Sequence, residues 1–457
     1  MMGERTVAQE PLFYAFSVER HVPADHLLRS IDRFVDLSGI REHLRPYYSE
    51  MGRPSIDPEL MIRMLIVGYC MGIRSERRLC DEVHLNLAYR WFCRLGLDGD
   101  VPDHSTFSKT RHGRFRDSDL LRQLFEATVK RCIAERLVGG DGFAVDASLL
   151  RAEANRQRFH SGEEGLPPDL SSRAVDEYLA VLDDAAFGAA TPVVPSRISP
   201  SDPAARYTSA HGGQAQFCYA TNYLIDVQNA VIVDVEASTA VRQAEVTAAK
   251  RMIERVHNGL GIWPRKLIAD TGYGSAEMLA WLVHERDIEP HIPVFDKSGR
   301  AAGAFARADF AYDIDGDHYI CPAGKVLKRG RPRSGDPDQP HADGFFRYRA
   351  SKIDCDNCAL KPRCCPGADP RKIPRSVHEG ARDLARAIAD EDEWLTSRRE
   401  RKKVEMLFAH LKRILRLDRL RLRGPQGARD EFHLAAAAQN LRKLAKLIPM
   451  PMQPVPA

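Results

Sequence analysis

Three acidic residues of this 457-residue chain stand where a metal-dependent reaction on phosphate esters needs them. Asp146 and Asp270 each end a short apolar run that is typical of a buried strand. Strand-end carboxylates point into the crevice where α/β sheets bind ligands. Mg²⁺ takes hard oxygen ligands and keeps open positions for water and phosphate. Together with Glu405, which lies in a basic helical segment, these acids predict a site for two Mg²⁺ ions.

Each of these acids also has an alternative explanation. A strand-end Asp often caps the next turn or helix. Glu405 follows Arg401 by four residues on one helical face, and an exposed pair at this spacing contributes only about 0.2–0.5 kcal/mol. If that helix lies along DNA, Arg401 and Lys412 would instead neutralise phosphates beside a metal-bound Glu405.

Two further acids are weaker candidates for the metal site. Asp141 precedes Asp146 by five residues, an odd spacing that places it on the other face of the strand. Asp234 falls inside a predicted hairpin.

The segments around the acids predict an α/β fold with a mixed sheet. A strand begins near Phe143, and two β-rich runs separated by Gln228 and Asn229 form a hairpin. A helix, a strand ending at Asp270, a second helix and a last strand follow, at residues 242–258, 264–270, 276–286 and 289–294. Because parallel strands need crossover helices, we expect helices on both faces of the sheet.

Changes in hydrophobic periodicity and composition along the chain predict its domain organisation. Apolar residues recur at helical spacing before residue 137, and the pattern becomes strand-like after Gly139. Hydrophobic periodicity is mostly lost in a Pro- and Gly-punctuated stretch, and long helical patterns then resume. The expected parts are a helical domain at 15–137, the first part of the α/β domain at 138–296 with a loop-rich insertion at 151–215, a cysteine-bearing insertion at 297–389, C-terminal helices at 390–447, and a Pro-rich tail at 448–457.

Composition excludes several classes of protein. Apolar residues make up 44% and charged residues 28%, as in ordinary globular proteins, so collagen-like and largely disordered chains are set aside. No run reaches the roughly 18 apolar residues of a membrane span, and the first residues show no apolar signal core. We therefore expect a cytoplasmic protein without a membrane partner.

The charge distribution points to a polyanion. The net charge is only +4, but residues 396–423 carry eleven Lys or Arg against three acids. In the helical domain, a short helix beginning near Ser105 carries Lys109, Arg111 and Arg114. A basic terminal helix of this kind can enter a DNA groove, whereas a helical bundle with solvated charges is the alternative.

Five cysteines fall in the second insertion. A C-x2-C pair binds Zn²⁺ through a tight turn, and two more thiolates complete a tetrahedral site. Clustered cysteines in a reducing cytosol are more often metal ligands than disulfides, although reduced cysteines without metal remain the alternative. The expected ligands are Cys321, Cys355, Cys358 and either Cys364 or Cys365, whereas Cys70, Cys80, Cys93, Cys132 and Cys218 lie in apolar runs and are expected in the core.

Several motifs together carry a resemblance to a family. They are AVDAS around Asp146, IADTGYGS around Asp270, and the spacing of Arg401, Glu405 and Lys412. SDPAAR at 201–206, YATNYLID at 219–226 and PDHSTFSKTRHGRF at 102–115 agree in order. On these motifs the chain resembles the DDE transposases of bacterial insertion sequences over residues 15–447. It departs at Arg398, where the family usually has Tyr.

The resemblance implies a fold and an activity. It implies an RNase H-like catalytic core in which Asp146, Asp270 and Glu405 hold two Mg²⁺ ions for cleavage and strand transfer of DNA. The partners implied are the terminal inverted repeats of the element and target DNA, bound by a homodimer near the nucleoid. Two competitors are a relative that only binds DNA and a nuclease of the same fold that hydrolyses without joining strands.

Overall fold

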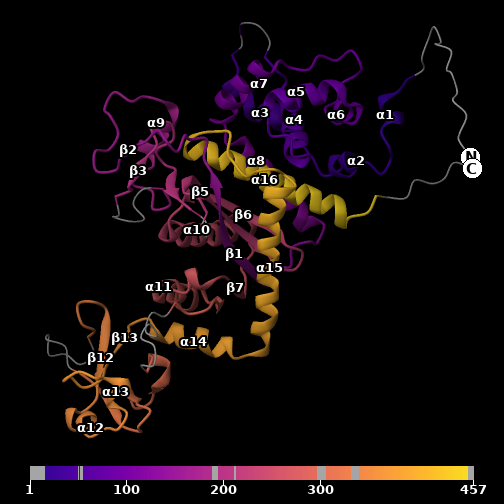
Figure 1. Cartoon of the computed structure of the whole chain (residues 1–457). Helices are drawn as coiled ribbons and strands as arrows, with labels where there is room; N and C mark the ends of the chain where they lie inside the picture. The colour runs from indigo at the N-terminus through magenta and orange to yellow at the C-terminus, as the bar shows by residue number, and fades with distance from the viewer. Residues whose placement is uncertain are drawn as a thin grey trace, which may run out of the picture. The chain divides into compact units, whose positions relative to one another are not determined.

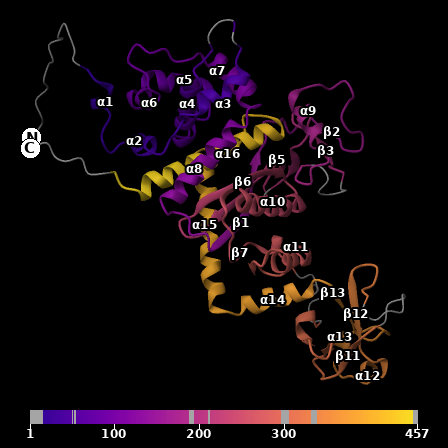
Figure 2. The same cartoon turned by 180° about the vertical axis from the view of Figure 1, so that it is seen from behind.

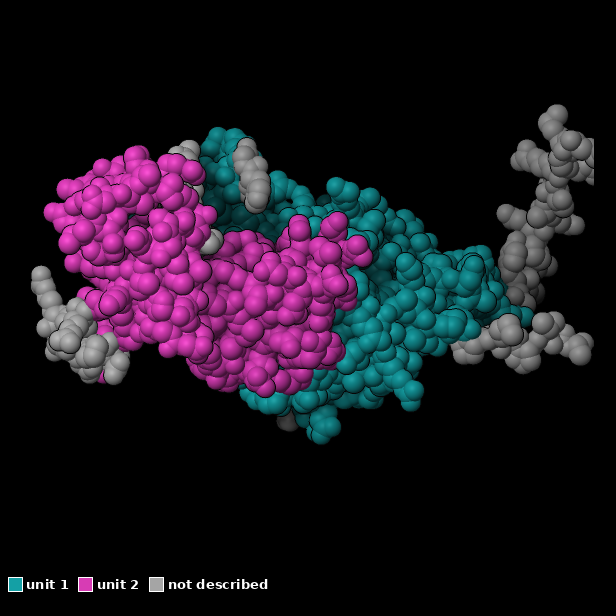
Figure 3. Space-filling model, turned by 90° about the horizontal axis from the view of Figure 1, so that it is seen from below, with its two compact units in different colours: residues 1–139, 147–262, 403–457 teal, residues 140–146, 263–402 magenta. Residues whose placement is uncertain are grey.

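The computed structural model describes residues 16–49, 51, 55–187, 194–209, 213–295, 305–330 and 339–450. The chain divides into two compact units (Figure 3). Unit 1 comprises Met1–Gly139, Ala147–Ile262 and Lys403–Ala457, and unit 2 comprises Gly140–Asp146 and Trp263–Lys402. Most of the predicted Pro-rich tail, residues 451–457, lies outside the described residues.

Unit 1 begins with the helices that the sequence predicts. Asp57 starts the central one, because its Oδ1 accepts hydrogen bonds from the backbone of Glu59 and Leu60 and Pro58 occupies the first helical position. The helices are α1 (Val18–His21), α2 (Leu27–Asp32), α3 (Ile40–Leu44), α4 (Pro58–Cys70), α5 (Glu76–Leu85), α6 (Leu87–Phe92), α7 (His104–Thr110) and α8 (Leu120–Ala134), with a π-helical turn at Arg111–Phe115 after α7.

The antiparallel part of the main sheet also lies in unit 1. The predicted hairpin is confirmed as β5 (Gln216–Asp226) and β6 (Val231–Thr239), and β4 (Arg206–Thr208) pairs with the first residues of β5, Gln216 to Cys218. α10 (Arg242–Leu260) and α16 (Gly424–Leu447) contact this sheet from opposite faces (Figures 1 and 2). The sequence pattern predicts a last helix at residues 431–447, and α16 begins seven residues earlier, with Pro425 in its first turn, where a missing N–H costs nothing.

The parallel part of the sheet lies in unit 2. The first half of β1 (Gly142–Arg151) pairs with β7 (Lys266–Ile268), which pairs with β8 (Glu289–His291). α11 (Ala276–Ala280) and a π-helical turn at Trp281–Glu285 form the predicted crossover, and α14 (Glu379–Ala389) contacts α11 and β8. The predicted mixed sheet with covering helices is therefore present.

The sequence pattern predicts one helix in the loop-rich insertion, at residues 173–186, and the structure has α9 (Arg173–Ala180), which ends six residues earlier. Two short strands, β2 (His160–Ser161) and β3 (Arg197–Ile198), pair with each other. Every helix within the described ranges is too short or too polar to cross a membrane.

The cysteine-bearing segment holds strands that its sequence pattern does not predict. Five short antiparallel strands form one sheet in the order β13-β12-β11-β10-β9, packed around Leu327, Tyr348 and Ile373. Strands of three to five residues offer too few alternations to be recognised by period. They are β9 (Ala311–Asp313), β10 (His318–Ile320), β11 (Val326–Arg329), β12 (Phe345–Arg349) and β13 (Lys372–Ser376), joined by α12 (Lys352–Asp356) and α13 (Lys361–Cys364).

α15 (Asp392–Arg413) is one continuous helix that contributes to both units (Figure 1). Helical spacing predicts an apolar stripe of Val404, Leu407, Leu411 and Ile414, and the first three of these side chains are buried. Ile414 is 49% exposed, contrary to the prediction, because the helix ends at Arg413 and the chain turns away.

Candidate active site

β1 carries Asp146 to the point where the sheet becomes accessible. Residues 142–145 are buried, and residues 146–149 are half-buried. Gly142, Phe143 and Ala144 pair in register with Lys266, Leu267 and Ile268 of β7. Asp146 follows Ala144, the last residue of β1 that pairs with β7, by two residues, and Asp270 follows Ile268, the end of β7, by two residues. Both predicted acids therefore lie in unit 2, just beyond the paired part of these two strands.

A tight turn fixes the backbone of Asp270. Its Oδ1 accepts a hydrogen bond of 2.7 Å from the backbone N of Gly272, so the capping role considered from the sequence is present. Gly274 closes the turn, and its carbonyl accepts a 2.9 Å bond from Phe295 N. A Cβ on Gly274 would lie 2.1 Å from the carbonyl oxygen of Pro293, so only glycine fits there.

The first half of α15 is bound to β7 and β8 of unit 2. Lys266 Nζ lies 2.9 Å from Glu393 Oε1 and 3.5 Å from Glu400 Oε2. Hydrogen bonds from Arg265 and Lys266 hold the pKa of Glu393 at about 2. Ser397 Oγ and His291 Nδ1 are 2.8 Å apart. These contacts fix the register of α15 along the sheet.

Arg401, near the end of this half, reaches the first acid. Its Nη1 lies 3.9 Å from Asp146 Oδ2, with the two side chains 32% and 19% exposed. Arg401 thus has a carboxylate partner on the sheet, in addition to the Glu405 pairing that the sequence left open.

The second half of α15 is fixed within unit 1. Lys412 Nζ donates a 2.8 Å hydrogen bond to Ser148 Oγ on β1, and burial lowers the pKa of Lys412. The Phe408 ring stacks on Tyr223 with centroids 4.8 Å apart. Glu405 is exposed on this half of the helix. Ser148 was not singled out from the sequence, although its place two residues after Asp146 puts it on the same face of β1.

The structure therefore assembles the predicted residues in two groups. Arg401 contacts Asp146 in unit 2, where Asp270 also lies, and Lys412 donates a hydrogen bond to Ser148 of β1 in unit 1. Glu405 lies in unit 1, one helical turn beyond Arg401.

The predicted Mg²⁺ site offers carboxylate oxygens as its ligands. Carboxylate oxygens have the donor chemistry that Mg²⁺ prefers. In the part of the chain that the structure describes, however, no three His, Cys, Asp or Glu side chains form a group that could hold a metal ion. The predicted Mg²⁺ ligands thus have the donor type that Mg²⁺ prefers, and the Mg²⁺ site stays a prediction.

The cysteines of the second insertion gather around one small cavity of about 30 Å³ in unit 2. Burial raises the pKa of Cys355, and the neighbouring thiols of Cys365 and Cys321 raise it further. The donors have the type that Zn²⁺ requires but not a converging geometry, so zinc stays a prediction. Cavity-lining cysteines are Cys321, Cys355, Cys358, Cys364 and Cys365, whereas Cys70, Cys80, Cys93, Cys132 and Cys218 are buried as predicted.

Two family models match the chain. Residues 16–113 match a model described as "Transposase domain (DUF772)", and residues 320–445 match one described as "Transposase DDE domain". The chain is a DDE transposase of the insertion-sequence type. The second match includes Glu405 and the five clustered cysteines, while Asp146 and Asp270 lie outside both matched ranges.

The three residues that the sequence predicts to contact DNA in the transposase's helical domain differ in exposure and in hydrogen-bond partners. Lys109 is exposed on α7. Arg114 Nη1 donates to Ser55 Oγ at 2.5 Å. Arg111 is only 3% exposed and donates to Glu76 Oε1 at 2.9 Å and to the Tyr69 hydroxyl at 3.0 Å. A buried, paired guanidinium holds the helices together and would have to break these bonds to meet a phosphate.

The two lower-ranked acids of the transposase have structural partners. Asp234 is fully buried, with Arg122 Nη1 at 2.6 Å and Arg255 Nε at 2.8 Å. Asp141 is exposed, and its Oδ1 lies 3.2 Å from Arg265 Nε.

Proposed function

We propose that this transposase cleaves and joins DNA by metal-dependent phosphoryl transfer, with Asp146, Asp270 and Glu405 as its catalytic acids. The observation that supports this best is the parallel pairing of β1 with β7, because Asp146 and Asp270 each follow the last paired residue of their chain segment by two residues. The contact between Arg401 and Asp146 brings α15 to these strands one helical turn before Glu405. Glu405 on α15 is the third acid of the proposal.

The metal ions would supply the charge that phosphoryl transfer needs. Two bound Mg²⁺ ions polarise the phosphoryl oxygens and lower the pKa of bound water. The residues of the chain would position the acids. The turn at Gly272 fixes Asp270, and Lys412 anchors α15 to β1. Arg401 offsets the carboxylate charge and can pair with a phosphate, because guanidinium matches phosphate geometry.

The architecture supports an RNase H-like core for this chemistry. Parallel strands β1, β7 and β8 stand beside the antiparallel strands β4 to β6, and helices cover the sheet. The cysteine-bearing segment separates β8 from α14 and α15 in the sequence, as an insertion in such a core would.

DNA is the proposed partner throughout. The helical domain, through exposed groups such as Lys109, would bind the terminal inverted repeats of the element. Arg401 and Lys412 would neutralise phosphates near the acids, and two copies of the chain would bind one pair of ends. A protein with these partners would be associated with the nucleoid.

A strand-cleavage assay on duplex DNA carrying the element ends tests this proposal. We expect nicking that requires Mg²⁺, and joined product when a pre-cut 3′ end and target DNA are supplied. Hydrolysis without joined product would favour a nuclease of the same fold. Binding without any metal-dependent cleavage would overturn the enzymatic proposal and favour a relative that only binds DNA.

A further inference from the structure

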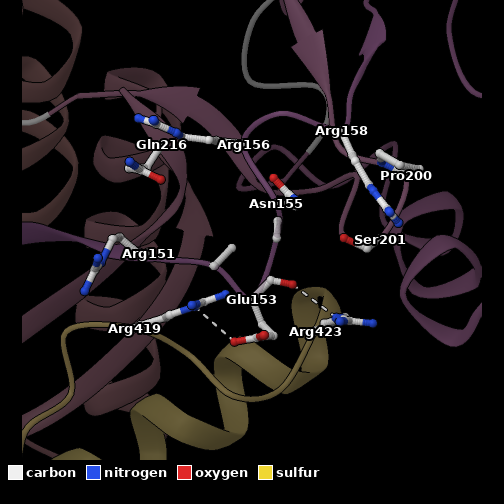
Figure 4. A pocket seen from close by; sticks show the side chains of 12 residues that line it. Arg151, Glu153, Asn155, Arg156, Arg158, Pro200, Ser201, Gln216, Arg419 and Arg423 are labelled. Atoms are coloured by element: carbon white, nitrogen blue, oxygen red, sulfur yellow. Dashed lines mark hydrogen bonds and ion pairs between the residues drawn. The ribbon is translucent and has the colours of Figure 1, made fainter. Parts of the chain in front are cut away.

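An arginine-rich pocket of about 610 Å³ lies in unit 1, near the end of β1 (Figure 4). Its wall comes from the end of β1, the first part of the loop-rich insertion and the segment between α15 and α16. The charged residues that line it are Arg151, Arg156, Arg158, Arg419 and Arg423, with Glu153 as the acid among them.

The single acid in this pocket is already engaged. Glu153 Oε2 lies 3.0 Å from Arg419 Nε, and the Glu153 carbonyl accepts a 3.1 Å hydrogen bond from Arg423 Nε. Figure 4 shows Glu153 between these two arginines. Arg151 pairs with Asp418, which does not line the pocket. Glu153 therefore offsets only one of the five positive charges.

Two arginines remain for a ligand. Among the described residues, the side chains of Arg156 and Arg158 make no hydrogen bond or ion pair. Arg156 is half-buried and Arg158 is exposed. Five arginines in the wall of one pocket raise the local positive potential, so this pocket concentrates anions.

The basic lining continues into a neighbouring cavity of about 710 Å³ in the same unit. The two cavities share Glu153, Pro200, Ser201 and Arg423. The second adds Arg421, Arg173, Arg116 and His112. An extended ligand with several negative charges fits this arrangement better than a single small anion does.

The lining chemistry identifies the anion as phosphate esters. Arginine forks bind phosphate oxygens in pairs, and five arginines in one pocket exceed what a carboxylate ligand needs. Pockets for small metabolites are mostly apolar, whereas this one is lined chiefly by Arg, Glu, Asn, Ser and Gln.

The volume of the pocket distinguishes between double-stranded and single-stranded DNA as the source of these phosphates. A cavity of this volume is in the range of roughly 300–1,000 Å³ that holds one small ligand. A DNA duplex, whose major groove alone is about 12 Å wide, cannot enter it, whereas a few unpaired nucleotides can. Along β1, the pocket begins at Arg151, five residues after Asp146.

We propose that this pocket binds the phosphates of an unpaired DNA strand, through Arg156 and Arg158 in particular. The inference rests on the proposed function, because strand cleavage by the transposase is what produces DNA ends that can separate from their complement. The pocket holds such an end close to the strand that carries Asp146.

Binding of a fluorescent 12-nucleotide oligodeoxythymidylate, compared with a 12-base-pair duplex, tests the inference. Without metal, Arg156→Ala/Arg158→Ala should weaken binding of the single strand about tenfold or more at low salt. Its salt dependence should flatten by about 1.4 units of slope, because each lost single-strand phosphate contact removes roughly 0.7. Duplex affinity should change less than threefold. Arg156→Lys/Arg158→Lys should restore the salt slope but only part of the affinity.

The matched control is Lys130→Ala/Lys446→Ala, which removes two exposed cations of unit 1 outside the pocket. It should bind the single strand within threefold of the parent protein. Equal losses in the control and the pocket variant, equal losses for single strand and duplex, or no loss at all would each overturn the inference. All variants should retain the parent melting temperature, because none of the four side chains has an internal partner among the described residues.

The same experiment separates this inference from the proposed function. A protein that binds the single strand through Arg156 and Arg158 but shows no metal-dependent cleavage would overturn only the proposed function. A protein that cleaves, yet binds the single strand equally well without these arginines, would overturn only the pocket.

Discussion

Nη1 of Arg401 on α15 lies 3.9 Å from Oδ2 of Asp146 on β1. This contact joins a cation of the C-terminal helix to the first strand-end acid within unit 2. Helical periodicity alone offers Arg401 a partner only four residues away, in Glu405. In the proposed enzyme, the cation offsets carboxylate charge until DNA and metal ions bind.

Removing any one acid should abolish strand cleavage. We expect Asp146→Asn, Asp270→Asn and Glu405→Gln each to reduce the cleavage rate more than a hundredfold with little loss of DNA affinity, because each takes metal-binding charge from the site. Asp141→Asn is the control, since Asp141 pairs with Arg265 at the other end of β1. A variant that retains cleavage within about tenfold, a barrier change of about 1.4 kcal/mol, removes its residue from the triad.

The cations that flank Glu405 should contribute to the salt dependence of DNA binding. Arg401→Ala/Lys412→Ala should flatten the dependence for duplex DNA by about 1.8 units, because each phosphate contact contributes roughly 0.9. Specific and random duplexes should be weakened alike, since phosphate contacts carry no sequence information. If the slope is unchanged in titrations between low and high salt, the two side chains serve only their contacts with Asp146 and Ser148.

Zinc binding by the cysteine cluster is testable on purified protein. We expect close to one zinc per chain by metal analysis, and loss of structure in the cysteine-bearing sheet before the main sheet when a chelator is added. Cys355→Ser should lower both zinc content and stability. Cys132→Ser, in the core of unit 1, should leave the zinc content unchanged. A metal-free protein that is insensitive to chelators would contradict the prediction.

Two buried acids should make unit 1 less stable as the pH rises. Burial raises the pKa of Asp202 to about 7, although a hydrogen bond from Tyr219 acts to lower it. Burial raises the pKa of Asp430 to about 8, although the charge of Arg116 acts to lower it. Unfolded Asp titrates near pH 3.9, roughly. Between these values the folded chain binds more protons than the unfolded chain, so stability falls from about pH 4 to pH 8 and then levels off.

Asp430→Asn should remove part of this slope. The amide stays neutral at every pH, so the variant should be close to the parent at pH 5 and more stable at pH 8.5, by on the order of 1 kcal/mol or more. Urea unfolding at both pH values measures the difference, with the exposed Asp141→Asn as control. Equal effects at the two pH values would show that Asp430 does not titrate in this range.

Gly274→Ala should damage the turn that holds Asp270. The new Cβ would meet the backbone oxygen of Pro293, which cannot move as a flexible side chain would. We expect a loss of about 1–3 kcal/mol in unfolding free energy and a lower cleavage rate. Gly259→Ala is the control, because a Cβ there meets nothing within 4 Å. A fully active and stable Gly274→Ala would show that the turn tolerates displacement.

The local pattern of the sequence was sufficient to predict the strands and the helix that carry the acids. Apolar runs ending in Asp146 and Asp270 predicted two strands, and the pairing of β1 with β7 confirms that they are neighbours. The hairpin, the crossover helix and the long basic helix were also predicted, because long elements repeat their period several times. The short strands around Tyr348 were missed because each contains only one or two alternations.

Tertiary structure alone decided the partners of individual charges. Arg111 looked like an exposed basic residue of a DNA-facing helix, yet it pairs with Glu76 in the core. No sequence pattern marks Arg156 and Arg158 in the loop-rich insertion, yet in the folded chain they line the same pocket as Arg419 and Arg423. A side chain's charge is a local property, whereas its burial and its neighbours depend on segments hundreds of residues away. Sequence pattern therefore predicted the elements that carry the acids, and only packing determined which cations are buried in internal pairs and which stay exposed.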